Sequence, residues 1–230
     1  MARLARIVVP DLPYHVTQRG NGRQPTFFGD DDFALYRDLL AEASATARVQ
    51  VWAWVLMPNH VHLILVPSDP DGLRRSLALT HRRYAGIIHA RERRTGHFWQ
   101  GRYGAVLLDE PHLAAAVRYI AQNPVRAKLV AAPADWRWSS VHAHLTGADD
   151  GLTTIEPVAS RIPDFADFIA TEADPEASLR LRRAESIGRP LGDNAFLQEI
   201  EARTKRILRP AKRGPKSKPE PSNARQGQLL

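Results

Sequence analysis

The chain of 230 residues contains no cysteine, and this absence excludes several kinds of chemistry at once. Disulfide bonds, thiolate nucleophiles and cysteine-ligated zinc or iron–sulfur centres all need a residue that is not there. Long apolar runs are also missing, since the longest, Val51 to Pro58, is far too short for a bilayer. Too few apolar residues precede Pro10 for a secretory signal. We therefore expect a cytoplasmic protein that does not interact with membranes.

Acidic residues are in the minority, with 25 Asp and Glu against 32 Lys and Arg, and lysine contributes only 5 of the basic residues. The imbalance is uneven along the chain. Residues 1–148 hold 18 basic and 12 acidic residues, residues 149–202 hold 5 and 12, and residues 203–230 hold 9 and 1. The basic front and tail predict a polyanionic partner, most simply nucleic acid, and a nucleoid-associated location within the cytoplasm.

Hydrophobic periodicity predicts a mixed α+β fold. Alternating or continuous apolar stretches indicate strands, and apolar residues at helical spacing indicate helices between them. The predicted order is β-α-β-β-α-β-α, which is a ferredoxin-like antiparallel sheet with one additional helix. The predicted elements are strands at 14–18, 49–57, 60–66 and 98–108, and helices at 30–48, 72–93 and 109–123.

The character of the chain changes near residue 148, where Asp149-Asp150-Gly151 and several prolines mark a boundary. We expect one domain over residues 1–148 and a mainly helical extension over 149–208, with short helices near 163–171, 175–187 and 194–207. The tail at 209–230 has no hydrophobic period, so we expect it to be disordered alone.

His60 and His62 are the first candidates for chemistry. Residues i and i+2 of a strand point to the same face, so both imidazoles can reach one ion. Without thiolates, two imidazoles completed by oxygen ligands and water suit Mg²⁺ or Mn²⁺ near a phosphate better than catalytic zinc. The alternative is a pair of histidines that make ordinary hydrogen bonds on a half-buried face.

Tyr119 and Asn123 are the second pair. Their i, i+4 spacing on the predicted helix makes the two side chains neighbours. A phenol and an amide oxygen beside a two-histidine ion would form a unit for phosphoryl transfer, with the phenol as nucleophile. The alternative is a core tyrosine followed by an asparagine that ends the helix before Pro124.

Several basic and aromatic residues could contact DNA. Two arginines flank a glycine-rich turn after the first strand, others follow the helix at 72–94, and a tryptophan in the fourth strand could stack on unpaired bases. The alternative for the glycine-rich loop is a solvated turn, and the alternative for the helix is a solvated face. The alternative for the tryptophan is a place in the core. The predicted contacts are Arg19, Arg23, Arg75, Arg82, Arg83, Trp99, Arg102 and, in the tail, Lys212 and Arg213.

Two segments resemble the signatures of the HUH single-tyrosine transposases, and more closely those of the REP-associated tyrosine transposases. They are Trp54-Val-Leu-Met-Pro-Asn-His-Val-His-Leu-Ile64 and Tyr119-Ile-Ala-Gln-Asn-Pro-Val-Arg-Ala127. The stretches at 14–21, 98–103 and 136–140 also resemble this family, so the resemblance covers residues 8–145. Val141 departs from the aromatic residue that is expected after Ser140.

The resemblance implies that His60 and His62 bind the metal, that Tyr119 is the nucleophile and that Asn123 is a third, amide ligand. It implies cleavage and rejoining of single-stranded DNA at short palindromic hairpins through a 5′-phosphotyrosine. One tyrosine per chain implies a monomer that turns over twice or a homodimer. A non-catalytic hairpin-binding regulator on the same fold, and a rolling-circle initiator or relaxase, remain as alternatives.

Overall fold

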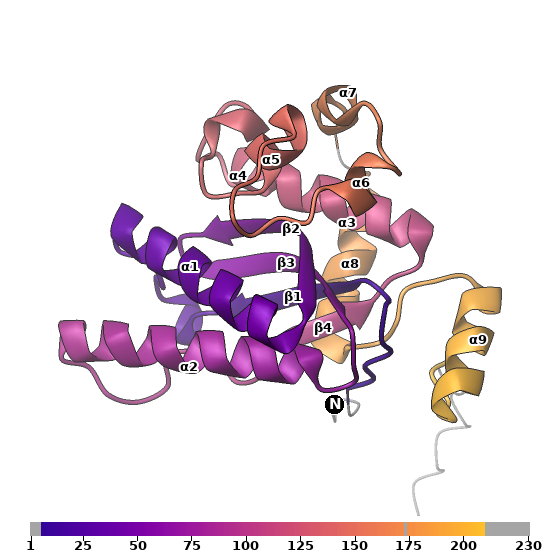
Figure 1. Ribbon diagram of the computed structural model, residues 1–230, viewed down its shortest axis with the longest axis horizontal. Coiled ribbons are helices and arrows are strands. Elements are labelled where there is room, and N and C mark those ends of the chain that lie inside the picture. The colour runs from indigo at the N-terminus through magenta and orange to yellow at the C-terminus, as the bar shows by residue number, and fades with distance from the viewer. Residues whose placement is uncertain (1–5, 173, 210–230) are drawn as a thin grey trace, which may run out of the picture.

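The computed structural model describes residues 6–172 and 174–209. The predicted order of strands and helices is present, with further short helices in the second half (Figure 1). The elements are β1 (Tyr14–Arg19), η1 (Asn21–Arg23), α1 (Asp30–Ala47), β2 (Val49–Met57), β3 (His60–Pro67), α2 (Gly72–Glu92), β4 (Gly104–Leu107), α3 (Glu110–Ala121), α4 (Asn123–Arg126), η2 (Pro133–Asp135), α5 (Val141–Thr146), α6 (Glu156–Ala159), α7 (Phe165–Ala170), α8 (Pro175–Ile187) and α9 (Asn194–Thr204).

The described strands form one antiparallel sheet with the order β2-β3-β1-β4. A β-α-β-β-α-β chain arranged in this way has the ferredoxin-like fold, so the predicted fold class is confirmed. The two strands that are central, β3 and β1, pair with Thr17 opposite His62 and Arg19 opposite His60. This register brings side chains from two distant parts of the sequence onto one face of the sheet.

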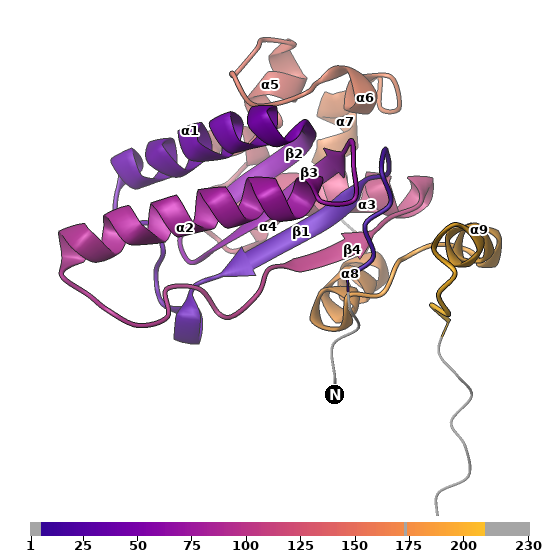
Figure 2. The same ribbon diagram turned by 60° about the horizontal axis from the view of Figure 1, so that its bottom comes forward.

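Helices cover both faces of the sheet, which explains why β2 and β3 are apolar throughout. Figures 1 and 2 show α1 and α2 side by side on one face and α3 and α8 behind the other. Val61, Leu63 and Leu65 of β3 pack in the core under α1 and α2. Ile64 and Val66 alternate with them and pack in the second core with α3 and α8. In the described residues, no helix is long and apolar enough to cross a membrane.

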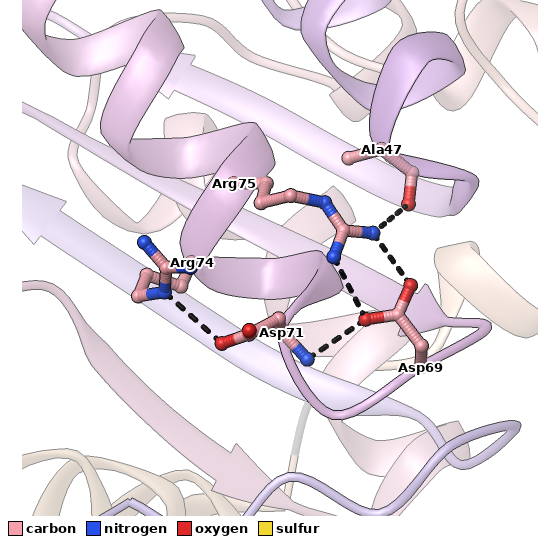
Figure 3. A network of polar contacts seen from close by, with 5 residues as sticks. All are labelled: Ala47, Asp69, Asp71, Arg74 and Arg75. Atoms are coloured by element: carbon pink, nitrogen blue, oxygen red, sulfur yellow. Dashed lines mark hydrogen bonds and ion pairs between the residues drawn. The ribbon is translucent and has the colours of Figure 1, made fainter.

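An arginine at the start of α2 ties the two helices of the first face together (Figure 3). Arg75 donates to both carboxylate oxygens of Asp69, at 3.0 and 2.5 Å, and to the carbonyl of Ala47 at the end of α1, at 3.3 Å. Asp69 also accepts from the backbone N–H of Asp71, whose carboxylate in turn accepts from Arg74. The guanidinium of Arg75 thus holds the β3–α2 turn against the last turn of α1.

A buried histidine between these helices should limit stability in acid. His81 shares a 2.9 Å hydrogen bond with the hydroxyl of Tyr36, and burial lowers its pKa from 6.5 to about 3. The unfolded chain takes up this proton below pH 6.5 and the native protein does not, so stability is lost as the pH falls from 6.5 toward 3. Between pH 7 and pH 5 this titration should lower the unfolding free energy of the wild-type protein by about 2 kcal/mol. The His81→Gln variant should lack this loss, which urea denaturation at the two pH values measures. An unchanged pH dependence would contradict this assignment.

The fourth strand is shorter than predicted, because it begins at Gly104 and not at Phe98. Residues 98–103 instead turn across the end of β1, where Gln100 donates to the carbonyl of Arg19 and Asn21 donates to the carbonyl of Phe98. Gly101 lies in the turn with φ +70°, a conformation that breaks a strand and that glycine adopts without strain. The turn places Arg102 beside the end of β1.

Helices α7 and α8 pack on the second face of the sheet, and a later segment lies along the β4 edge. Leu191 donates to Leu107 and accepts from the N–H of Asp109, so the chain runs beside the sheet edge just after α8. Gly104 allows α8 to approach closely, since a Cβ there would lie 2.7 Å from Thr17 Oγ1 and 3.3 Å from the carbonyl of Glu185. Side chains of α8 therefore lie directly over β1 and β3.

Candidate active site

His60 and His62 lie on the sheet face that α3 and α8 cover. Their ring centroids are 4.9 Å apart, and Val61 between them points into the opposite core. His62 is only 1% exposed, whereas His60 is partly exposed and lines an open cleft. The two imidazoles therefore share one face, as strand alternation requires.

The orientation of His60 is fixed by Asn59. The amide nitrogen of Asn59 donates to the carbonyl of Arg23 at 3.1 Å, and this leaves its Oδ1 facing His60 Nδ1 at 2.6 Å. An amide oxygen only accepts hydrogen bonds, so the proton of the neutral ring lies on Nδ1 and the lone pair lies on Nε2. Burial lowers the pKa of His60 to about 4, which keeps the ring neutral and able to ligate a metal.

A third imidazole, that of His15 on β1, lies beside His62. His15 Nε2 and His62 Nδ1 share a hydrogen bond of 3.0 Å. From α8, Glu185 Oε1 lies 3.7 Å from His15 Nδ1 and 3.9 Å from His62 Nδ1. One potential ligand atom from each of these three residues lies within 4.8 Å of the other two. Two imidazoles and a carboxylate form a donor set that suits divalent metal ions.

Tyr119 of α3 faces the histidines. Its ring centroid lies 5.3 Å from that of His62 and 5.9 Å from that of His15, both edge-on. The side chain is buried except for its contact with the cleft, where it lies beside His60 and Glu185. The predicted nucleophile and the predicted metal pair are thus together in the structure.

Charges around Tyr119 act on its phenol in opposite directions. Burial raises the pKa of Tyr119, and the nearby carboxylate of Glu185 raises it further. Arg182 of α8 interacts with the phenol oxygen and, with Arg19, lowers the pKa again. The guanidinium of Arg126 lies over the ring, 4.4 Å from its centroid. Burial outweighs these cations, so the pKa of Tyr119 stays above its ordinary value of 10.0, and the arginines limit the rise.

Two adjoining hollows form the open side of the site, with volumes of about 340 and 440 Å³. Arg19, His60, Arg182 and Glu185 line both of them. The larger contains Tyr119 and Arg23, and the smaller extends along Gln100 and Arg102. A cleft lined by arginines beside a phenol and imidazoles can hold a phosphodiester backbone.

Asn123, the predicted amide ligand, follows a break in the helix. α3 ends at Ala121, and Asn123 begins the short α4 with Pro124 in its first turn, where a missing N–H is tolerated. Asn123 is 7% exposed and is not among the residues that line the cleft. Its role as a ligand therefore stays a prediction.

The predicted arginine contacts among the described residues fall into two groups. Arg19, Arg23 and Arg102 line the cleft. The arginines at 75, 82 and 83 belong to α2, which covers the opposite face of the sheet (Figure 2). Arg75 is held by Asp69 and Ala47, Arg83 pairs with Glu42 at 2.7 Å, and Arg82 is exposed.

The remaining predicted contacts lie away from the cleft or outside the described residues. Trp99 packs against Tyr84 and Phe98, and its Nε1 donates to the carbonyl of His81 at 3.1 Å. The half-buried ring therefore packs against the aromatic core next to α2, and its stacking on DNA bases stays a prediction. Lys212 and Arg213 lie outside the described residues, as does the predicted disordered tail.

Sequence reasoning did not identify His15, Arg182 or Glu185. For His15 there was a signal, because the ferredoxin-like order pairs the first strand with the third, which carries the His pair. For Arg182 and Glu185 there was none, since they belong to an acidic segment far along the chain. Only the packing of α8 on the sheet brings them to the cleft.

Comparisons with known proteins agree with this geometry. Residues 8–123, about half of the chain, match the family described as "Transposase IS200 like". No curated protein matches the sequence. The solved structure described as a REP-associated tyrosine transposase bound to a REP hairpin is similar with a TM-score of 0.56 and 19% identity, over 66% of this chain and 90% of that chain. A putative transposase from Deinococcus radiodurans R1 has a TM-score of 0.37 and 23% identity, over 52% and 95%.

The family match includes β1, both strands of the hairpin, the His60 and His62 pair, and Tyr119. The similarity to the REP-associated structure extends the agreement to the fold. The resemblance drawn from the two motifs is confirmed at this level: the chain belongs to the IS200-like transposase family.

Proposed function

We propose that this transposase is a metal-dependent, single-strand-specific DNA endonuclease that cleaves and rejoins DNA at short palindromic hairpins. The observation that carries the proposal is the position of Tyr119, edge-on to His62 and open to a cleft shared with His60. Arg19, Arg23, Arg102 and Arg182 line that cleft and its neighbour. A relative with the same fold is described as bound to a REP hairpin, which favours hairpin DNA as the partner here.

In this proposal a phosphodiester lies in the cleft with its phosphorus near Tyr119 Oη. The phenol loses its proton and attacks phosphorus, a Tyr119 O–P bond forms, and the bond to the 3′-oxygen breaks. The leaving 3′-oxygen takes up a proton, and the 5′ end stays attached as a phosphotyrosine. A different 3′-hydroxyl can reverse the step and join new ends without an external energy source, since the ester bond is conserved.

The residues present fit a divalent metal ion. The neutral ring of His60 has a free lone pair on Nε2, and His62 lies on the same face. We assign these two residues as ligands, with Asn123 as the amide ligand that the motif suggests. Mg²⁺ or Mn²⁺ bound there would polarise the scissile phosphate and neutralise part of its charge. The arginines of the cleft hold the neighbouring phosphates and orient the strand.

Arg182 should set the pH range of cleavage. It lowers the pKa of Tyr119, so Arg182→Ala should raise that pKa and move the rise of the cleavage rate to higher pH. A phenol pKa that is higher by one would reduce the rate at neutral pH by about tenfold, because the phenolate fraction falls by that factor. Single-turnover rates on a labelled hairpin from pH 6 to pH 10 measure this change.

Arg180→Ala is the matched control for this prediction. Arg180 belongs to the same helix but pairs with Asp174 and Glu176, and it does not line the cleft. We expect the control to keep the wild-type profile. A profile that is equally unchanged in Arg182→Ala would show that this arginine does not act on the nucleophile.

The basic tail should add sequence-independent affinity. Residues 210–230 carry five basic residues and one acidic residue. Removing them should weaken DNA binding and flatten its salt dependence, by about 0.7 in the log–log slope for each phosphate of single-stranded DNA that the tail neutralises. Replacing the five basic residues by glutamine keeps the length and should have the same effect. An unchanged slope in both variants would exclude contact between the tail and DNA.

A covalent adduct tests the proposed function directly. The wild-type protein, incubated with a 5′- or 3′-labelled single-stranded hairpin and Mn²⁺, should give a species that survives boiling in detergent. The label should remain with the protein only when it lies on the fragment downstream of the cut. Tight hairpin binding without any adduct, in Mg²⁺ and in Mn²⁺, would favour the non-catalytic regulator.

A further inference from the structure

The hydrogen bond between His15 and His62 is a direct contact between two ring nitrogens. The nitrogens are 3.0 Å apart, the ring centroids are 5.1 Å apart and the planes differ by only 17°. The two rings therefore lie end to end in nearly one plane, with the nitrogens between the centroids. In this arrangement the nitrogens point at each other and not at a shared ion. His15 Nε2 and His62 Nδ1 are consequently hydrogen-bond partners and not two ligands of one metal.

The direction of this bond determines whether His62 can bind an ion. Both imidazoles are fully buried, and a buried imidazole is neutral and carries one proton. If His15 donates, the proton of His62 lies on Nε2 and neither of its nitrogens has a lone pair available for an ion. If His62 donates from Nδ1, its Nε2 lone pair is free.

Glu185 favours the second direction. His15 Nδ1 and Glu185 Oε1 are both buried and make no hydrogen bond among the described residues, and they face each other at 3.7 Å. When His62 donates to His15, the proton of His15 lies on Nδ1, directed at the carboxylate. If His15 donated to His62 instead, His15 Nδ1 would carry no proton. Two hydrogen-bond acceptors, this nitrogen and the carboxylate oxygen of Glu185, would then face each other in the protein interior, which costs free energy. Arg19 and Arg182 line the same hollows as Glu185, and cations beside a carboxyl group favour its ionised form.

We infer that Glu185 and His15 are positioning residues that hold His62 as the Nδ1–H tautomer, with its Nε2 presented to the metal. The chain of contacts runs from α8 through β1 to β3, so α8 completes a metal site whose histidine ligands lie more than a hundred residues earlier. Asn59 acts in the same way on His60. Carboxylate–histidine partners of this kind orient metal-binding imidazoles in many proteins. The inference rests on the proposed function.

The first experiment reads the tautomer in the metal-free wild-type protein at about pH 8, above the ordinary pKa of a carboxyl group and of an imidazole. Long-range ¹H–¹⁵N correlation NMR distinguishes a protonated from an unprotonated nitrogen in each ring, and single His→Gln variants at 15 and 62 assign the signals. We expect a proton on Nδ1 in both His15 and His62. A proton on Nε2 of His62 would overturn the inference, whatever the activity of the protein.

The second experiment measures Mn²⁺ binding by calorimetry, with Mn²⁺ alone as the probe. His15→Phe and Glu185→Leu should bind Mn²⁺ about 10- to 100-fold more weakly. Glu185→Gln keeps an acceptor oxygen for His15 and should stay close to the wild-type affinity. Glutamine and leucine variants that lose the same affinity would instead make the carboxylate a direct ligand, which contradicts the inference.

His81→Phe is the matched control, since it removes a buried imidazole on the other face of the sheet. It should leave Mn²⁺ affinity unchanged, even where it lowers the thermal stability as much as His15→Phe does. Equal losses of affinity in the two variants would mean that His15 acts only through stability. If the wild-type protein bound no Mn²⁺, the proposed metal dependence would fail, while the NMR result would still decide the tautomer.

Discussion

Tyr119→Phe is expected to abolish both DNA cleavage and the covalent adduct. The substitution removes one oxygen and keeps the ring that packs against His62 and under Arg126. Stability should therefore change by less than about 1 kcal/mol, and hairpin affinity should stay within a few fold. Nucleophile removal typically lowers turnover by a factor on the order of 10⁴ or more, and here it also removes the atom that would carry the DNA. Denaturing gels for the adduct and filter binding for affinity measure the two effects separately.

The other tyrosines provide controls whose positions the structure defines. Tyr36 and Tyr84 are buried on the opposite face of the sheet, where their hydroxyls bond to His81 and to the carbonyl of Thr26. Their phenylalanine variants should lose some stability and still form the adduct. An adduct that persists in Tyr119→Phe would keep the enzyme class and overturn the choice of nucleophile. An adduct that is also lost in Tyr84→Phe would indicate an effect of folding and not of chemistry.

Removal of the metal should have the second largest effect. Chelation with EDTA, or His62→Ala, should reduce cleavage by a factor on the order of 10³, because a bound ion contributes several kcal/mol to stabilising charge on the phosphate. Hairpin binding should largely remain, since the arginines of the cleft are not ligands. Single-turnover cleavage in EDTA, and then with Mg²⁺ or Mn²⁺ restored, measures the dependence.

The variant and the chelator should differ in one respect. Excess Mn²⁺ restores the chelated wild-type protein but not His62→Ala, because the ligand itself is missing. His81→Gln, which alters a buried imidazole far from the cleft, should respond to EDTA and Mn²⁺ as the wild type does. Undiminished cleavage in EDTA would refute the metal assignment and leave Tyr119 as a nucleophile assisted only by arginines.

The sequence alone determined those features that depend on local spacing. Strand alternation placed His60 and His62 on one face, and hydrophobic periodicity predicted the order of elements from which the ferredoxin-like fold follows. The prediction of helix 175–187 agrees with α8, which spans Pro175–Ile187. α3 ends at Ala121, two residues before the predicted end at Asn123, and Asn123 begins the short α4. Each of these results depends on the chemistry of residues within about one turn or one strand.

Only the tertiary structure decided which distant side chains meet. Sheet order puts His15 next to His62, and the close approach of α8 at Gly104 puts Glu185 and Arg182 over β1 and β3. The same packing holds Trp99 half-buried beside His81 and places α2, with its arginines, on the face away from Tyr119. A residue type and its spacing do not specify such partners, because contacts between segments far apart in the chain depend on how whole elements pack. For this reason the sequence indicated the candidate nucleophile and the histidine pair, and the fold supplied the residues that lie against them.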